Sequence, residues 1–236
     1  PNLFAEDIEI DRKTGIAYFS VSDFSKLSQP IPFEKDGFIS KYDIKSRQHR
    51  VMKLVAPENF SFNPHGISLF RDTNTETLYL FAVSHRNDRK DYMEVFLVDE
   101  VNEQLVHQNT VHSDLFKVAN SIVAVSPTEF YVTNFVGSDF GSFIMTLEAV
   151  TDRPWANILF CDLSSCKIAA NGLISANGLA KSLDGSYVFL GHTLTKQFTV
   201  FLRNTSSNEL SLIETHPLQH TADNVDVDEL NQIWIA

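Results

Sequence analysis

The chain has 236 residues, of which 43% are hydrophobic, 21% charged and 11% aromatic, a composition that excludes disorder as the default state. With 19 Lys and Arg residues against 30 Asp and Glu residues, its formal net charge is −11, which opposes binding to nucleic acid and favours cations. No apolar run approaches the roughly 18 residues that cross a bilayer, so we expect no membrane-spanning helix.

A repeated unit runs along the chain from its first residues. Each copy has a polar residue, one further residue, an apolar strand-like stretch, a short turn, and a second strand that carries an aromatic residue. The polar residues that begin the copies are 46 to 59 residues apart, and they are Glu6, His65, Asn120, Asn177 and Asp223. The aromatic residues of the second strands are Tyr18, Tyr79, Tyr131, Tyr187 and Trp234. Such regularity predicts a repeated hairpin.

A second pair of strand-like stretches follows the hairpin within each unit. Clear examples span residues 38–44 with 51–55, 93–98 with 104–111, and 198–202 with 209–213. Four-stranded units repeated around an axis form a β-propeller, so the predicted fold class is all-β. We expect a single propeller domain over residues 1–236 whose C-terminal part is missing, because the chain ends partway through the fifth unit.

The segment 137–152 interrupts the strand pattern of the third unit. Its apolar residues recur at helix-like intervals, and they are Phe143, Ile144, Leu147 and Val150. This spacing predicts a short amphipathic helix. Such a helix either packs on the edge of a sheet or covers a pocket as a lid, and the sequence leaves both open.

Two cysteines and two possible glycosylation sites give information about the cellular compartment of the protein. Cys161 and Cys166 either form a disulfide bond in an oxidising compartment or remain two buried or free thiols, and the sequence leaves both states open. Asn59 and Asn204 each begin a sequence that fits the pattern for a glycoprotein. Together these features favour a secreted protein.

The residues that open the first strands are predicted to form one site. In a propeller these strands line a central channel, so their opening residues converge at one end of it. Carboxylate and amide side chains supply oxygen ligands, which calcium prefers and zinc does not. We therefore predict a calcium site formed by Glu6, Asn120, Asn177, Asp223 and the neighbouring Asn224. The alternative is a polar channel mouth that water hydrates.

His65 holds the same repeat position but is a poor calcium ligand. We therefore place it beside the metal, as the general base for the attack of water on an ester or lactone. His85, at the end of the next strand, is predicted to hydrogen-bond His65 and set its tautomer, the alternative being a solvated loop histidine. The chain has no G-x-S-x-G, H-E-x-x-H or Gly-rich phosphate motif that would favour other chemistry.

Five segments together resemble the paraoxonases and arylesterases, a family of calcium-dependent lactonases. They are AEDIEI from Ala5, SFNPHGIS from Ser61, IVAVSPTEFYVTN from Ile122, ANGLAKSLDGSYVFL from Ala176 and ADNVDVD from Ala222. The resemblance implies a six-bladed β-propeller with two calcium ions in its channel, of which this chain covers about four and a half blades. It also implies hydrolysis of lactones, aryl esters and sometimes phosphotriesters.

The resemblance carries the family's site residues onto this chain by position. The catalytic calcium would be held by the five residues predicted above, and the histidine dyad would be His65 with His85. The second, structural calcium would use Asp7 and the backbone carbonyl of Ile67, with Ser121 at the position of an aspartate. A neutral hydroxyl there replaces a charged ligand, which weakens the predicted structural site.

The favoured prediction is an enzyme, a calcium-dependent lactonase and arylesterase that acts on a small lactone or ester. The competing prediction is a non-catalytic propeller that acts as a secretory-pathway chaperone or binding module. Ser121 favours it, as does Phe135, which stands where relatives have an acidic residue. A sugar-lactone hydrolase of the gluconolactonase type would share the propeller but lack SFNPHGIS. We expect a secreted or secretory-pathway protein, with membrane or lipoprotein association through segments outside this chain.

Overall fold

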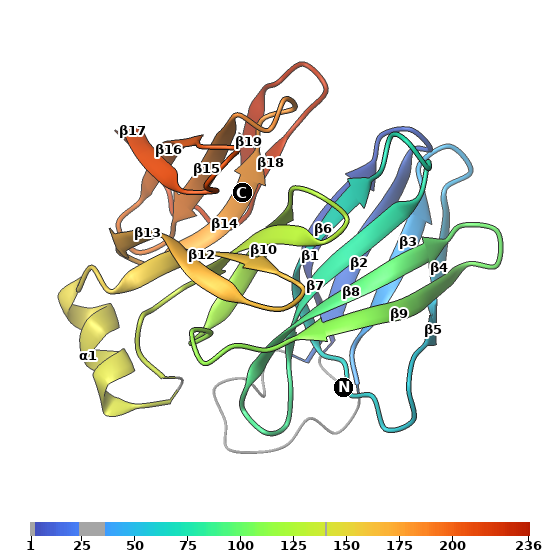
Figure 1. The fold of residues 1–236 in the computed structure, drawn as a ribbon, viewed down its shortest axis with the longest axis horizontal. Helices are drawn as coiled ribbons and strands as arrows, with labels where there is room; N and C mark the ends of the chain where they lie inside the picture. The colour runs from blue at the N-terminus through green and yellow to red at the C-terminus, as the bar shows by residue number, and fades with distance from the viewer. Residues whose placement is uncertain (1–2, 24–35, 140) are drawn as a thin grey trace. The chain divides into compact units, whose positions relative to one another are not determined.

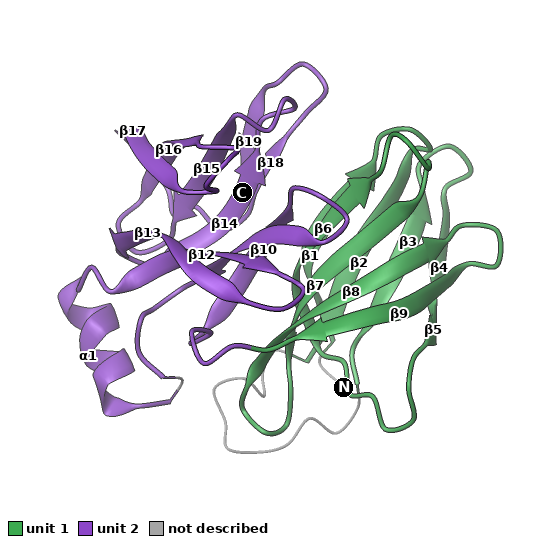
Figure 2. Ribbon diagram, viewed as in Figure 1, with its two compact units in different colours: residues 1–112 green, residues 113–236 purple. Residues whose placement is uncertain are grey.

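The computed structural model describes residues 3–23, 36–139 and 141–236 (Figure 1). The chain divides into two compact units, residues 1–112 and 113–236 (Figure 2). Both consist mainly of antiparallel strands joined by turns, so the all-β prediction is confirmed. That residues 1–236 form a single domain stays a prediction.

Unit 1, residues 1–112, contains two sheets in which consecutive strands pair side by side. The first sheet comprises β1 (Phe4–Asp11), β2 (Ile16–Ser22), β3 (Phe38–Asp43) and β4 (Gln48–Val51). The second comprises β6 (Pro64–Arg71), β7 (Leu78–His85), β8 (Asp91–Asp99) and β9 (Gln104–Val111). A short strand, β5 (Lys53–Val55), joins the second sheet in parallel with β9.

The stretch 51–55, expected as one strand, instead supplies strands to both sheets of unit 1. Met52 is 4% exposed and donates its N–H to Ile39 O over 2.9 Å within the first sheet. The next N–H, of Lys53, donates to Glu103 O over 3.1 Å at the second sheet. The prediction of one continuous strand was therefore wrong, because the burial of Met52 turns the chain from one sheet to the other.

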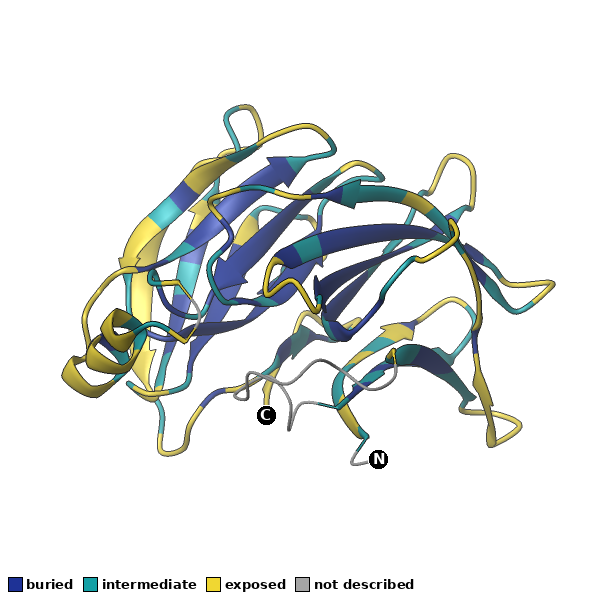
Figure 3. Ribbon diagram, turned by 90° about the horizontal axis from the view of Figure 1, so that it is seen from below, coloured by how far each residue is buried: buried dark blue, intermediate teal, exposed yellow. Residues whose placement is uncertain are grey.

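The core of unit 1 comes from apolar side chains that alternate along these strands. Its cluster includes Tyr18 from β2, Ile39 from β3, Ile67 from β6, Leu80 from β7 and Phe96 from β8. Each of these is at most 2% exposed, and full burial of such a side chain contributes about 1.5–3 kcal/mol. Figure 3 shows buried residues along the strands and exposed residues in the turns. This core fixes β6 and β7, which carry the two predicted catalytic histidines.

An ion pair with two carboxylates ties β1 to β6 in unit 1. Arg71 Nη2 lies 2.6 Å from Asp11 Oδ2, and its Nε lies 3.2 Å from Asp11 Oδ1. Arg71 Nη2 also lies 3.0 Å from Glu100 Oε1. Burial opposes the ionisation of Asp11, but hydrogen bonds from Arg71 and Thr14 outweigh it and lower the pKa of Asp11.

We expect Asp11→Asn to lower the free energy of unfolding by about 2 kcal/mol at neutral pH. A carboxylate with a lowered folded-state pKa stabilises the fold above its unfolded pKa of about 3.9, and this contribution is lost as pH falls through the folded value. The difference between wild type and variant should therefore shrink in acid. Urea unfolding of the full-length protein at neutral and acid pH measures it, with Asp114→Asn at an exposed position as control. An equal difference at both pH values would contradict the assignment.

Unit 2, residues 113–236, contains two four-stranded sheets and a strand pair. The first sheet comprises β10 (Ala119–Ala124), β11 (Glu129–Asn134), β12 (Ala156–Asp162) and β13 (Cys166–Leu173). The second comprises β14 (Ala176–Lys181), β15 (Tyr187–His192), β16 (Gln197–Arg203) and β17 (Leu210–Pro217). The pair is β18 (Val225–Val227) with β19 (Ile233–Ile235). The described residues thus form four repeats of four consecutive strands, whereas the six-bladed ring and the count of four and a half blades stay predictions.

Helix α1 (Phe143–Thr151) lies within the segment predicted to be helical but is anchored by a polar residue. Its apolar side chains are between 43% and 81% exposed, and they are Phe143, Ile144, Leu147 and Val150. The buried residue is Glu148, whose carboxylate accepts the N–H of Gly137 over 2.7 Å and that of Ser138 over 3.1 Å. Of the two roles that the sequence left open, the structure does not show packing of the apolar face on a sheet edge, because those side chains are exposed and the helix is anchored through Glu148. Among the described residues, no helix has the length and apolar character to cross a bilayer.

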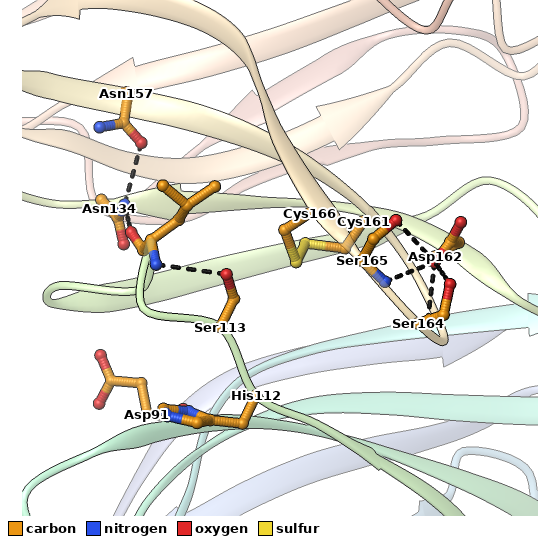
Figure 4. Close-up of a disulfide and its surroundings, with 11 residues drawn as sticks. Asp91, His112, Ser113, Asn134, Asn157, Cys161, Asp162, Ser164, Ser165 and Cys166 are labelled. Carbon is orange, nitrogen blue, oxygen red and sulfur yellow. Dashed lines mark hydrogen bonds between the residues drawn. A yellow bond between two sulfur atoms is a disulfide. The ribbon is translucent and has the colours of Figure 1, made fainter.

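Cys161 and Cys166 form a disulfide bond across the hairpin of β12 and β13 (Figure 4). The two residues are opposite partners in the strand register, so the turn itself brings their sulfur atoms together. Asp162 closes this turn, because its Oδ1 accepts the N–H groups of Ser164 and Ser165, each over 2.7 Å. Of the two states that the sequence left open, the structure has the bridged one.

Candidate functional site

In the four complete repeats, the polar residue that begins the repeat lies in a β-bulge of the first strand. In β1, β6, β10 and β14, two residues face a single residue of the neighbouring strand. The bulged stretches are 6–7, 65–66, 120–121 and 177–178, and the residues that face them are Ser20, Val83, Thr133 and Gly191. A bulge bends its strand and re-aims the side chains. The sequence repeat therefore marks a shared backbone irregularity.

In unit 1, the bulges of β1 and β6 bring Glu6 and His65 together. His65 Nε2 lies 3.3 Å from Glu6 Oε1. The other ring nitrogen, Nδ1, lies 2.9 Å from Nε2 of His85 at the end of β7, and the two rings are inclined by 79°. The hydrogen bond predicted between the two histidines is thus present. His85 is 7% exposed and is not a solvated loop residue.

Asp91, which the sequence did not mark as a site residue, extends this series of contacts. Its Oδ1 lies 2.7 Å from His85 Nδ1, and the residue is 9% exposed. His85 and Asp91 are opposite partners at the ends of β7 and β8. The only signal in the sequence was the short polar turn of residues 86–90, which folds an acidic residue back onto the histidine.

Asp7, the second residue of the first bulge, links the two sheets of unit 1. Its Oδ2 accepts the N–H of Ile67 over 2.7 Å, and its Oδ1 accepts that of Ile8 over 2.8 Å. Its own N–H donates to Ser20 Oγ over 3.0 Å. Burial, together with neighbouring carboxylates, raises the pKa of Asp7 well above its usual value. Both carboxylate oxygens are thus already engaged with the backbone.

In unit 2, two predicted calcium ligands present buried amide oxygens. Within the described structure, Oδ1 of Asn120 and Oδ1 of Asn177 are shielded from solvent and accept no hydrogen bond. A buried acceptor left in this state costs about 1–3 kcal/mol unless water or a cation binds it. Asn177 Nδ2 donates to Asp223 Oδ1 over 2.6 Å and to Thr193 Oγ1 over 2.8 Å, which fixes the orientation of the amide. Thr193 was not predicted as a site residue, and no pattern in the sequence indicated it.

Gly178, the second bulge residue of β14, lets the segment before β18 approach closely. Its N–H donates to Asp223 O over 2.8 Å. A Cβ atom at this position would lie 2.4 Å from that carbonyl oxygen and 2.7 Å from Asn224 Cα. Only glycine lacks this atom, so only glycine permits the close contact. That contact keeps Asp223 and Asn224 beside Asn177.

Ser121 performs in unit 2 the task that Asp7 performs in unit 1. Its Oγ accepts the N–H of Leu179 over 3.0 Å, and its own N–H donates to Thr133 Oγ1 over 2.9 Å. The residue is 3% exposed. Its hydroxyl therefore satisfies a buried backbone donor between β10 and β14.

The residues predicted for the two calcium ions differ in how well they suit a cation. No group of three or more His, Cys, Asp or Glu side chains that could hold a metal occurs in the part of the chain that the structure describes. The first predicted set relies on amides as well as carboxylates, and the unbonded oxygens of Asn120 and Asn177 suit calcium, which prefers oxygen ligands. The second set suits a cation less well, because Ser121 carries no charge and the oxygens of Asp7 and Ser121 already accept backbone N–H groups.

Two comparisons of the sequence with known proteins both find arylesterases. A family model described as Arylesterase matches residues 6–236 of the chain. The human protein named serum paraoxonase/arylesterase 2 is 35% identical over 238 residues. That alignment covers 98% of this chain and 65% of the human protein, so the chain spans about two thirds of the length of this relative.

The backbone is also similar to solved structures of low sequence identity. The periplasmic gluconolactonase of Pseudomonas aeruginosa has a TM-score of 0.59 at 14% identity, covering 97% of this chain and 63% of that structure. A β-propeller domain from Myceliophteria thermophila has a TM-score of 0.57 at 9% identity, covering 98% of this chain and 61% of that structure. At these identities the likeness shows the fold alone, and that fold is a β-propeller.

Proposed function

The chain belongs to the arylesterase family, and from this membership we propose that the protein hydrolyses lactones and aryl esters, with phosphotriesters as further substrates. The observation that carries the proposal is the hydrogen-bonded pair of His65 and His85 beside the carboxylate of Glu6. This arrangement places a base next to a carboxylate that suits a cation, and the two together can promote the hydrolysis of an activated carbonyl. The name of the human relative, serum paraoxonase/arylesterase 2, agrees with this reaction class.

A calcium ion bound by Glu6, Asn120, Asn177, Asp223 and Asn224 would supply polarisation of the substrate carbonyl and stabilisation of the negative charge that develops on it. Two observations in unit 2 support this assignment. The amide oxygens of Asn120 and Asn177 are buried without a hydrogen bond in the described structure. The bond from Asn177 Nδ2 to Asp223 Oδ1 holds the adjacent ligands together.

His65 acts as the general base in the proposed mechanism. Its Nδ1 is engaged with His85, so Nε2, which faces Glu6, is the nitrogen that accepts a proton from the attacking water. The oxygen of that water bonds to the carbonyl carbon. Collapse of the tetrahedral centre breaks the ester C–O bond, and the leaving oxygen takes the proton back from His65. His85 shares the positive charge in between.

Hydrolysis of a δ-lactone and of phenyl acetate by the full-length protein tests the proposal. We expect both activities to be lost after calcium is chelated and to return with calcium but not with magnesium, whose stricter octahedral geometry a set of amide and carboxylate oxygens does not meet. Initial rates before and after chelation are the measurement. Wild-type rates in the absence of calcium would reject a calcium-dependent hydrolase.

A non-catalytic, calcium-stabilised propeller that serves as a secretory-pathway chaperone or binding module is the second candidate. Ser121 favours it, because a neutral hydroxyl committed to the N–H of Leu179 stands where an acidic residue was expected. The same assay separates the two candidates. A full-length protein that melts at a higher temperature with calcium but hydrolyses neither substrate would select the second.

We further propose a secreted or secretory-pathway location for the protein. The disulfide bond between Cys161 and Cys166 is of a kind that persists in oxidising compartments. Asn59 and Asn204, which begin the two glycosylation sequences, are both exposed. Association with a membrane or a lipoprotein stays a prediction.

A further inference from the structure

We propose that Asp91 is a positioning residue of the site, one that fixes the ring of His85 and through it the ring of His65. The inference rests on the proposed function, in which His65 is the base. Asp91 is a third member beside the two histidines. Its carboxylate sets which atom donates in the hydrogen bonds between Asp91 and His85 and between His85 and His65. Asp91 itself does not contact the reacting atoms in this proposal.

The hairpin of β7 and β8 places Asp91 opposite His85. The two residues are the last register pair before the turn, and side chains that are directly opposite in antiparallel strands have Cβ atoms about 4.5–5.5 Å apart. The turn is closed by the N–H of Arg86, which donates to Lys90 O over 3.2 Å. Arg89, at φ 62°, completes the reversal of the chain. Backbone pairing therefore holds the carboxylate within reach of the ring.

With both rings neutral and Asp91 ionised, the contacts allow one set of donors and acceptors, in which the 3.3 Å contact of His65 Nε2 with Glu6 Oε1 is not a hydrogen bond. An ionised carboxylate can only accept, so His85 Nδ1, 2.7 Å from Asp91 Oδ1, carries the proton and donates it. His85 Nε2 is then an acceptor, and His65 Nδ1, 2.9 Å away, is the donor. Nε2 of His65 is thereby left as the basic nitrogen. A single carboxylate thus selects the tautomer of both rings.

Burial makes this selection effective. His85 is 7% exposed and Asp91 is 9% exposed, so water competes poorly for the bond between them. A charge-assisted hydrogen bond in such surroundings is stronger than the same bond at the surface. Asp88, in the adjoining turn, is exposed and accepts the hydroxyl of Tyr92 over 2.7 Å and the N–H of Lys90 over 3.1 Å. Asp88 therefore offers the same charge without the contact to His85.

The first test compares Asp91→Asn with Asp88→Asn in the full-length protein. Asparagine keeps the shape of Asp91 but presents donors as well as an acceptor, so both tautomers of His85 become accessible. We expect kcat for lactone hydrolysis to fall by about tenfold to a hundredfold with KM changed less than about twofold. Asp88→Asn is expected to leave kcat unchanged. Wild-type kcat in Asp91→Asn, or an equal fall in the two variants, would overturn the proposal.

The second test does not depend on turnover or on the variant folding. Nitrogen-15 NMR of the imidazole rings in the wild-type full-length protein distinguishes protonated from unprotonated ring nitrogens. We expect Nδ1 of His85 to be protonated and its Nε2 to be unprotonated at neutral pH, and the opposite pattern would overturn the role of Asp91. If the wild type hydrolyses no lactone or ester, the proposed function fails, whereas this spectrum still decides whether Asp91 sets the tautomer.

Discussion

Replacing Asp223 by asparagine is expected to lower the turnover of lactones and aryl esters by at least about a hundredfold, the scale of losing an electrostatic stabiliser in an active site. Asparagine keeps the size of the side chain but removes one of the two carboxylates of the proposed calcium site. It also changes the acceptor that takes the 2.6 Å hydrogen bond from Asn177 Nδ2. The measurement is kcat of the full-length protein at saturating substrate and calcium.

Asp226→Asn is the matched control for this substitution. Asp226 lies three residues later, in β18, and its Oδ1 accepts the N–H of Val227 over 2.7 Å. Asp226→Asn removes the same charge from the same segment of the chain but changes no proposed calcium ligand. The variant should therefore hydrolyse substrate at close to the wild-type rate. Normal turnover in Asp223→Asn, or an equal loss in both variants, would show that Asp223 has no special role.

His65→Gln is expected to lower lactone turnover by about a hundredfold or more, because a positioned general base contributes 10²–10⁴-fold to a reaction. Glutamine can still hydrogen-bond His85, but it cannot take a proton from water. Aryl esters should lose less, because their phenolate leaving group departs readily once the carbonyl is polarised. The ratio of lactone to aryl-ester turnover is therefore the measurement that isolates the base.

The control for His65→Gln is His49→Gln, at an exposed position on β4. That variant should retain wild-type rates on both substrates. Lactone hydrolysis by His65→Gln at the wild-type rate would remove His65 from the mechanism, while leaving open the role of the carboxylates. A uniform loss on both substrates would instead assign His65 to a step that the two reactions share, which contradicts the expected difference.

The features that could be predicted from the sequence are those that recur along it. Repetition of an apolar strand after a polar residue indicated the hairpins, and four of the five polar residues fall in equivalent bulges of the structure. The contact between His65 and His85 followed from their places in one hairpin. Whether the oxygen ligands share an ion stays a prediction, because the residues concerned belong to both units.

The features that escaped prediction depend on a partner that the sequence does not reveal. Asp91 and Thr193 gain their roles from neighbours across a hairpin or on another strand, and neither residue belongs to a repeated motif. Met52 divides a strand because tertiary packing buries it. Glu148 is buried against the apolar pattern of its helix because the N–H groups of Gly137 and Ser138 satisfy its charge. Each of these outcomes was decided by non-local contacts.

At the four bulges, the type of side chain can differ from repeat to repeat while the strands around it pair in the same way. The two residues of a bulge share one residue of the neighbouring strand and lie outside the regular pairing, and the same backbone irregularity carries an acid in β1, an imidazole in β6 and amides in β10 and β14. Substitution there changes chemistry while the surrounding pairing is kept. The bulge positions are therefore where related proteins could diverge in activity. Protein engineering for a new reaction on this scaffold would begin with substitutions at them.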